Sequence, residues 1–239
     1  MEILRINLWS SPRNISTAFM YAFAQRSDAT VVDEPLYAHY LDVSGVQHPG
    51  QEAILASQNA DGNQVVQDVL LGPSTTPVLF FKQMTHHLIK LDDRFLKQMA
   101  NIMLIRDPRA IINSYAKVRP YPNMQDVGVQ QQFELFQKLQ AWGRLTAIIE
   151  TSILLQDPKH ILQKLCDRLD IPFQESMLSW PAGARPEDGV WAPYWYHNVH
   201  RSTGFKPYVP RSVELPPHLE ELAVQCQPYY ETLLNHVLK

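Results

Sequence analysis

The apolar positions of this chain gather in short runs between polar turns, and four of these runs have the length of buried strands. The four runs occupy residues 3–9, 30–32, 78–82 and 101–105. Apolar residues at helical spacing predict helices over residues 16–25, 50–59 and 88–99. Strands that alternate with helices are typical of a parallel sheet, so we expect an α/β fold with helices on both faces, a three-layer sandwich.

The second half of the chain is predicted to be mainly helical. In DPRAIINSYAKV, Asp107 precedes Pro108, which is the pattern of a helix with a carboxylate cap and a proline in its first turn. Further helices are predicted over residues 130–151, 157–169 and 217–238. Residues 173–217, rich in proline, are predicted to form loops. Since no repeat or linker divides the sequence, we predict a single domain over residues 1–239.

Composition narrows the class of protein. A chain of 239 residues with 45% hydrophobic residues can bury a large core. Its net charge of −3 comes from interspersed charges, so we expect no nucleic-acid partner. The two cysteines, Cys166 and Cys226, favour a reducing compartment over a disulfide framework. Because MEILRINLW carries charges at Glu2 and Arg5 and no apolar run has membrane-spanning length, we expect a cytoplasmic protein without a membrane partner.

The stretch LWSSPRNISTAFMYAF, residues 8–23, joins the end of a predicted strand to the start of a helix through a polar turn. A helix start presents unpaired N–H groups and the positive end of the helix dipole, both of which favour an anion. Arg13 adds a cation, and Ser16 and Thr17 add hydroxyl donors, so this turn is predicted to hold a phosphate-sized anion. It is not a Walker motif, because arginine replaces lysine and the turn has no glycine.

Polar residues follow each of the predicted strands, at residues 11–13, 33–34, 82–87 and 106–107. The carboxyl ends of parallel strands meet at one edge of the sheet, where ligands of such folds bind. We therefore expect these residues to converge on one site.

Three blocks in this order resemble the sulfotransferase family, which has a P-loop-like fold and uses 3′-phosphoadenosine 5′-phosphosulfate as donor. SPRNIST resembles the family's loop for the 5′-phosphosulfate, and IMLIRDPRAIINSYAKV resembles the block that holds the 3′-phosphate, with Arg106 and Ser114 in the binding positions. ILLQDPKHILQKLCDRLDIPF resembles a late signature of the family, and HRSTGFKPY, residues 200–208, is loosely similar to its late donor loop. The donor-binding residues that the resemblance implies are Ser11, Pro12, Arg13, Asn14, Ile15, Ser16, Thr17, Arg106, Ser114, Arg201, Ser202 and Gly204.

One position departs from the family pattern. Ile15 stands where the family usually has glycine, and a β-branched residue does not take the left-handed conformations open to glycine. Either the turn therefore has another shape or the donor differs. Arg13 in place of lysine is a milder change, because a guanidinium is a good fork for phosphate or sulfate oxygens.

The resemblance implies transfer of a sulfuryl group to a hydroxyl or amine of a small-molecule or carbohydrate acceptor, without a metal. Two residues are candidates for the base: Glu34 resembles that of the carbohydrate and bacterial branches, and His86 resembles that of the cytosolic branch. We favour Glu34, because Pro35 restricts its backbone, and we expect it and the His86–His87 pair on opposite flanks of the turn. Lys82 either reaches the same region as Arg13, near the leaving phosphate, or caps the polar edge of the sheet.

Two other functions stay open. IMLIRD also resembles a Walker B strand, which favours a nucleotide-dependent kinase or phosphotransferase with Asp107 or Asp33 holding Mg²⁺. The chain can also be a nucleotide-binding module without catalysis. The late aromatic residues either stack on the acceptor or pack their loop onto the sheet, and we favour packing; they are Trp191, Tyr194, Trp195 and Tyr196.

Overall fold

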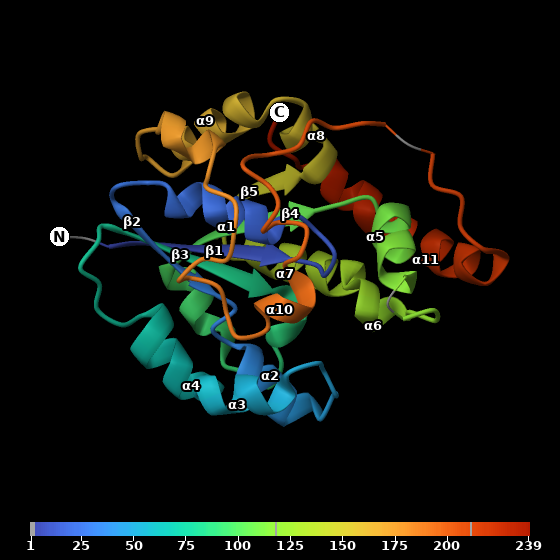
Figure 1. Cartoon of the computed structure of the whole chain (residues 1–239), viewed down its shortest axis with the longest axis horizontal. Helices are drawn as coiled ribbons and strands as arrows, with labels where there is room; N and C mark the ends of the chain where they lie inside the picture. The colour runs from blue at the N-terminus through green and yellow to red at the C-terminus, as the bar shows by residue number, and fades with distance from the viewer. Residues whose placement is uncertain (1–2, 118, 211) are drawn as a thin grey trace.

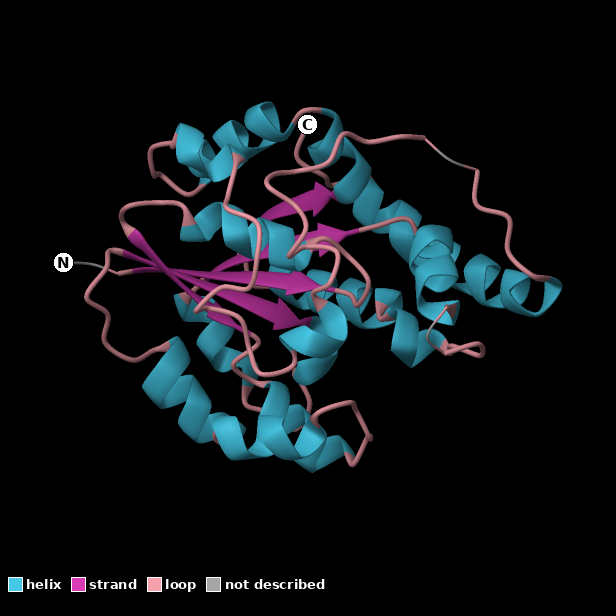
Figure 2. Cartoon of the chain, viewed as in Figure 1, coloured by secondary structure: helices cyan, strands magenta, loops and turns pink. Residues whose placement is uncertain are grey.

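A computed structural model describes residues 3–117, 119–210 and 212–239. At its centre lies a five-stranded parallel sheet with strand order β2-β3-β1-β4-β5 (Figure 1). The strands are β1 (Leu4–Ser10), β2 (Ala29–Asp33), β3 (Val78–Met84), β4 (Ala100–Ile105) and β5 (Leu145–Glu150). Their arrows point the same way in Figure 2, toward the side of the molecule that carries α5, α6 and α10 in Figure 1.

Helices cover both faces of this sheet. The α-helices are α1 (Ser16–Ala24), α2 (Tyr37–Ser44), α3 (Gln51–Ser57), α4 (Gly62–Val65), α5 (Pro108–Ala116), α6 (Met124–Val127), α7 (Val129–Ala141), α8 (Thr151–Gln156), α9 (Pro158–Arg168), α10 (Ala192–Trp195) and α11 (Pro217–Leu234). A π-helix, η1 (Val66–Leu70), and three 3-10 helices, η2 (Thr85–His87), η3 (Asp93–Gln98) and η4 (Glu175–Leu178), complete the set. None of the helices in the described ranges is both long enough and apolar enough to cross a membrane.

Successive side chains along each strand alternate between the two faces of the sheet, which separates two hydrophobic cores. Ile6 and Leu8 of β1 pack with apolar residues of α1 and α9, whereas Trp9 of the same strand packs with apolar residues of η1, α7 and α11. Phe80 and Phe81 of β3 divide in the same way between the two cores. Both faces of the sheet are therefore apolar and covered, and the predicted three-layer α/β architecture is confirmed.

Two predicted helices are wrong. Residues 88–99 form a turn followed by the short η3, because the Asp92 side chain accepts from the Arg94 N–H and starts a new, tighter helix there. The pattern over residues 130–151 combines α7 with β5, since Gly143, with φ of 62°, ends the helical course. The run LTAIIE reads as part of a helix in sequence but lies beside β4 as the fifth strand.

The sheet register brings polar residues to one edge, as the sequence predicts. Asp33 at the end of β2 pairs in register with Lys82 of β3. Ser10 at the end of β1 lies between Met84 of β3 and Leu104 of β4. The residues that follow these strand ends consequently face a common space beyond the sheet.

Candidate active site

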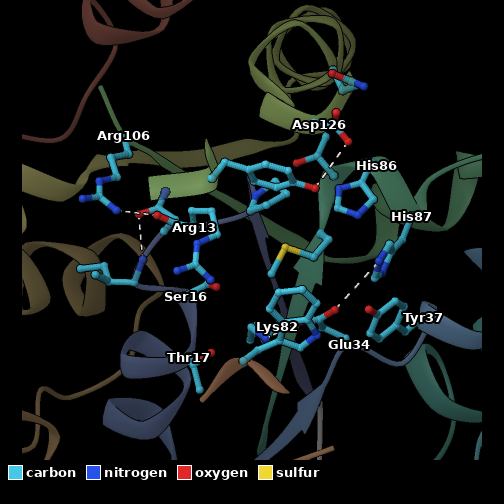
Figure 3. Close-up of a pocket in the computed structure, with 18 of the residues that line it drawn as sticks. Arg13, Ser16, Thr17, Glu34, Tyr37, Lys82, His86, His87, Arg106 and Asp126 are labelled. Atoms are coloured by element: carbon cyan, nitrogen blue, oxygen red, sulfur yellow. Dashed lines mark hydrogen bonds and ion pairs between the residues drawn. The ribbon is translucent and has the colours of Figure 1, made fainter. Parts of the chain in front are cut away.

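A cavity of about 1300 Å³ opens beyond the carboxyl ends of the strands (Figure 3). The predicted site residues that line it are Pro12, Arg13, Asn14, Ile15, Ser16, Thr17, Glu34, Lys82, His86, Arg106, Ser114, Ser202 and Gly204. Two predicted residues do not line it. Ser11 is buried outside the lining, and Arg201 is exposed and donates to Asn198 Oδ1 over 3.0 Å.

Asn14 holds the turn between β1 and α1 in place. Its side-chain Nδ2 donates to the Leu104 carbonyl over 3.1 Å, while its Oδ1 accepts from the Ile15 N–H at 2.9 Å and from Thr151 Oγ1 at 2.6 Å. These bonds connect the turn to β4 and to the first residue of α8. Asn14 is thus a structural clamp whose polar atoms are used within the protein.

The turn takes its left-handed residue at Arg13, with φ of 58°, and not at Ile15, whose φ is −95°. The negative φ of Ile15 lies outside the left-handed region that favours glycine, so a glycine is not needed there. Of the two explanations that the sequence left open for Ile15, the structure shows a turn that accommodates this residue. The side chain packs, partly buried, against the core that α1 shares with the sheet.

Replacing Ile15 by glycine therefore tests the shape of the turn. We expect Ile15→Gly to lower the free energy of unfolding by about 1–2 kcal/mol, because it removes apolar packing and adds backbone entropy to the unfolded chain. We expect no gain in nucleotide affinity. Thermal unfolding and titration calorimetry measure the two effects, and a tighter-binding Ile15→Gly variant would show that the isoleucine obstructs the site.

Arg13 and Arg106 form a cationic end of the cavity, on the left of Figure 3. Arg106 Nη1 donates to the Arg13 carbonyl over 2.5 Å, and Arg13 Nε donates to Ser114 Oγ over 3.2 Å. Burial, and then the charge of Arg13, lower the pKa of Arg106. Within the described residues neither arginine forms an ion pair with a carboxylate. Two neighbouring cations without a protein counter-ion suit a bound dianion.

Another part of the cavity lining contains Lys82, which is buried between two carboxylates. Its Nζ lies 2.8 Å from Asp33 Oδ1 and 2.5 Å from Glu34 Oε1, and it also donates to the Tyr196 hydroxyl over 2.6 Å. Burial alone lowers the pKa of Lys82, but the charges of the two carboxylates outweigh it and raise that pKa. Lys82 is therefore a permanent ammonium, and one ammonium neutralises only one of the two acids.

Glu34 is a buried acid with a shifted pKa. Burial raises the pKa of Glu34 against the opposing charge of Lys82, and the charge of Asp33 raises it further. Its backbone has φ of 39°, and its N–H donates to the Lys82 carbonyl over 2.9 Å. A left-handed residue ahead of Pro35 persists only where its surroundings hold it, which is typical of functional positions. Among the described residues Oε2 of Glu34 has no hydrogen-bond partner.

The histidines lie beside Glu34. His87 Nε2 is 3.9 Å from Glu34 Oε2, so the expectation that the two groups occupy opposite flanks of the turn is wrong. The His87 ring stacks between Tyr37 and Tyr40, with centroid distances of 5.0 and 4.8 Å. Burial lowers the pKa of His86 to about 3 and that of His87 well below its usual value. Both imidazoles are consequently neutral and weakly basic at pH 7.

The two aspartates considered as Mg²⁺ ligands have other partners. Asp33 bonds to Lys82 and accepts from the Tyr196 hydroxyl at 2.6 Å, and neither it nor Asp107 lines the cavity. Asp107 is exposed and caps α5 by accepting from the Arg109 N–H, as the sequence predicts.

Sequence reasoning missed several lining residues. Tyr37 and Tyr40 belong to α2, a helix that the sequence reading did not separate from the second strand. No local signal links Tyr196 to Lys82, because 114 positions separate them. The predicted packing role of the late aromatics holds for Trp191 and Tyr196, which are buried, but not for Tyr194, which is half exposed.

The family is decided by a match along nearly the whole chain. Residues 4–235 match the model of the sulfotransferase domain. The chain belongs to the sulfotransferase family.

The sulfotransferase fold recurs in two solved structures of low sequence identity. The sulfotransferase domain from the curacin biosynthetic pathway superposes with a TM-score of 0.53 at 17% identity, covering 94% of this chain and 98% of that one. The sulfotransferase domain from the Synechococcus PCC 7002 olefin synthase gives 0.56 at 18% identity, with coverages of 94% and 95%.

A closer relative in sequence carries a different kind of name. This sulfotransferase domain is 39% identical over 238 residues to branched-chain-amino-acid aminotransferase-like protein 2 of Arabidopsis thaliana. The match covers 99% of this chain but only 42% of that protein, so the chain spans less than half the length of this relative.

Proposed function

We propose that this domain transfers a sulfuryl group from 3′-phosphoadenosine 5′-phosphosulfate to a hydroxyl or amine of a small-molecule or carbohydrate acceptor. The observation that carries the proposal is the contrast between two parts of the lining of one cavity. Arg13 and Arg106 are cations without a carboxylate partner among the described residues, whereas Glu34 presents a buried carboxylate. The two arginines suit an anionic donor, and the carboxylate suits proton abstraction.

The two anionic groups of the donor, the 5′-phosphosulfate and the 3′-phosphate, are assigned to different residues. In this proposal Arg13 and the N–H groups of residues 14, 16 and 17 hold the 5′-phosphosulfate, since the Ile15 N–H is bonded to Asn14 Oδ1 and α1 starts at Ser16 without a side-chain cap on its first turn. Arg106 and Ser114 hold the 3′-phosphate, because the Arg13–Ser114 bond places this pair next to the turn. Ser202 and Gly204 line the same cavity and complete the donor site.

The reaction then needs few groups from the protein. The donor supplies the sulfuryl group, which passes between two oxygens. Glu34 Oε2 takes the proton of the acceptor hydroxyl, so the acceptor oxygen forms its bond to sulfur as the proton leaves. Arg13 stabilises the negative charge that develops on the departing phosphate oxygen. His86 is the alternative base, but the low pKa of its imidazole makes it a weaker proton acceptor than a carboxylate whose pKa burial raises.

Ligand binding tests the donor assignment. We expect adenosine 3′,5′-bisphosphate to stabilise the protein, by about 2.7 kcal/mol at one hundred times its dissociation constant, and ATP with Mg²⁺ to stabilise it less at the same concentration. Thermal-shift titration of both nucleotides measures this difference. Equal or stronger stabilisation by ATP with Mg²⁺ would favour the kinase alternative, and binding of bisphosphate without turnover of any acceptor would favour the non-catalytic nucleotide-binding module.

A further inference from the structure

All the hydrogen-bond donors of the Lys82 ammonium are used within the protein. An ammonium has three N–H donors, and those of Lys82 go to Asp33 Oδ1, Glu34 Oε1 and the Tyr196 hydroxyl. No N–H of Lys82 remains for a donor molecule in the cavity. Lys82 therefore acts on the reaction through Glu34 and not through direct contact with the transferred group.

The Tyr196 hydroxyl also makes all of its hydrogen bonds within the protein. It accepts from Lys82 Nζ at 2.6 Å and from Trp191 Nε1 at 3.0 Å, and donates its one hydrogen to Asp33 Oδ2 over 2.6 Å. Burial, followed by the charge of Asp33, raises the pKa of Tyr196 well above its usual value, so the phenol keeps its proton. Both lone pairs and the hydrogen of this buried group are thus satisfied.

The cluster joins two distant parts of the chain. Asp33 and Lys82 come from neighbouring strands of the sheet, whereas Trp191 and Tyr196 belong to the late loop region around α10. The Gly189 N–H of that region also donates to Asp33 Oδ2, over 3.2 Å. Asp33 Oδ2 therefore receives two hydrogens from the late loop region, while Oδ1 receives one from Lys82.

We propose that Tyr196 is a positioning residue that, through Asp33, governs how much of the Lys82 ammonium is available to Glu34. The inference rests on the proposed role of Glu34 as the base. Two carboxylates compete for one buried ammonium. The hydrogen bond from the Tyr196 phenol stabilises part of the negative charge of Asp33, so Asp33 depends less on Lys82. Without that hydrogen Asp33 draws Lys82 toward itself, and the Glu34 anion loses stabilisation.

Two substitutions that should shift the titration midpoint of Glu34 in opposite directions test this competition. In Tyr196→Phe, the Glu34 carboxylate should titrate about half a pH unit or more above its wild-type midpoint, because Asp33 competes more strongly for Lys82. In Asp33→Asn, it should titrate below that midpoint, because Lys82 then serves Glu34 alone and a repelling charge has gone. A general loosening of the fold would shift both variants in the same direction.

The titration is read by ¹³C NMR of the protein labelled at the glutamate side-chain carboxyl carbons, with the Glu34 resonance assigned from its loss in Glu34→Gln. Tyr194→Phe is the matched control, since Tyr194 lies in α10 two positions before Tyr196, is half exposed and does not line the cavity. We expect its midpoint to equal that of the wild type. If Tyr196→Phe does not fold, an unshifted Glu34 midpoint in Asp33→Asn still overturns the inference, because the two carboxylates then do not compete for Lys82.

An unchanged Glu34 midpoint in Tyr196→Phe, or shifts of the same sign in the two variants, would overturn the inference. Turnover is measured separately: in Tyr196→Phe the acid limb of the kcat/KM profile should move up with the midpoint, while the affinity for adenosine 3′,5′-bisphosphate stays the same. If the two variants shift the Glu34 midpoint in opposite directions but the wild-type protein sulfates no acceptor, the positioning role of Tyr196 is upheld and the proposed function is overturned.

Discussion

Glu34→Gln is expected to lower kcat by about a hundredfold or more, the usual contribution of a positioned base. The affinity for adenosine 3′,5′-bisphosphate should be unchanged, because Glu34 bonds to Lys82 and not to Arg13 or Arg106, from which it lies apart in Figure 3. Glutamine keeps the shape of the side chain and an oxygen that accepts from Lys82, so the fold should persist. Steady-state kinetics with the sulfated acceptor and calorimetry with the bisphosphate measure the two quantities.

The pH profile distinguishes the two candidate bases. A base works in its unprotonated form, so kcat/KM rises as the pH passes its pKa. Burial raises the pKa of Glu34, so the wild-type limb should lie above the ordinary carboxylate value of about 4.3, and the Gln variant should lose it. If His86 were the base, the limb would lie near pH 3, because burial lowers its pKa to about 3.

His86→Asn is the matched comparison for this experiment, since His86 lines the same cavity and stands next to His87, the neighbour of Glu34. We expect its loss of kcat to be much smaller than that of Glu34→Gln. Near wild-type turnover in Glu34→Gln together with a large loss in His86→Asn would transfer the role of base to the histidine.

Arg106→Ala is expected to weaken binding of adenosine 3′,5′-bisphosphate by about 1.5–3 kcal/mol, or roughly tenfold to 150-fold, because a charge-assisted contact to the 3′-phosphate is lost. Ser114→Ala should cost about 1 kcal/mol, the value of an ordinary hydroxyl contact. Neither change should affect adenosine 5′-phosphate to the same degree, since that ligand lacks the 3′ group. Calorimetric titration of both nucleotides into each variant gives the selectivity.

Arg109→Ala is the control for charge. Arg109 lies in the first turn of α5, and its guanidinium pairs with Glu220 and not with the cavity. It should leave both affinities unchanged. Because Arg106 also bonds to the Arg13 carbonyl, thermal unfolding must show that Arg106→Ala keeps its fold. Equal losses for the two nucleotides would mean that Arg106 does not hold the 3′-phosphate.

Local pattern was sufficient for most of the sheet and for the existence of the turn between β1 and α1. The apolar runs of β1 to β4 and the cap at Asp107 are short-range features, and the structure has them within about two residues of their predicted bounds. Parallel strands end at a common edge, so topology alone brought Arg13, Glu34 and Lys82 to one cavity. The amino-acid sequence thus determined the fold class and the general location of the site.

Tertiary structure decided the rest, because the deciding contacts join residues far apart in the chain. β5 follows Gly143 and is stabilised by pairing with β4, so its helix-like pattern misled a local reading. Glu34 proved to lie beside His87 because β2 and β3 are adjacent in the sheet. The partners of Lys82 include a phenol 114 positions away, and only burial in a common core makes that distance in sequence irrelevant. Charge pairing and desolvation depend on such enclosure, and no local sequence pattern encodes them.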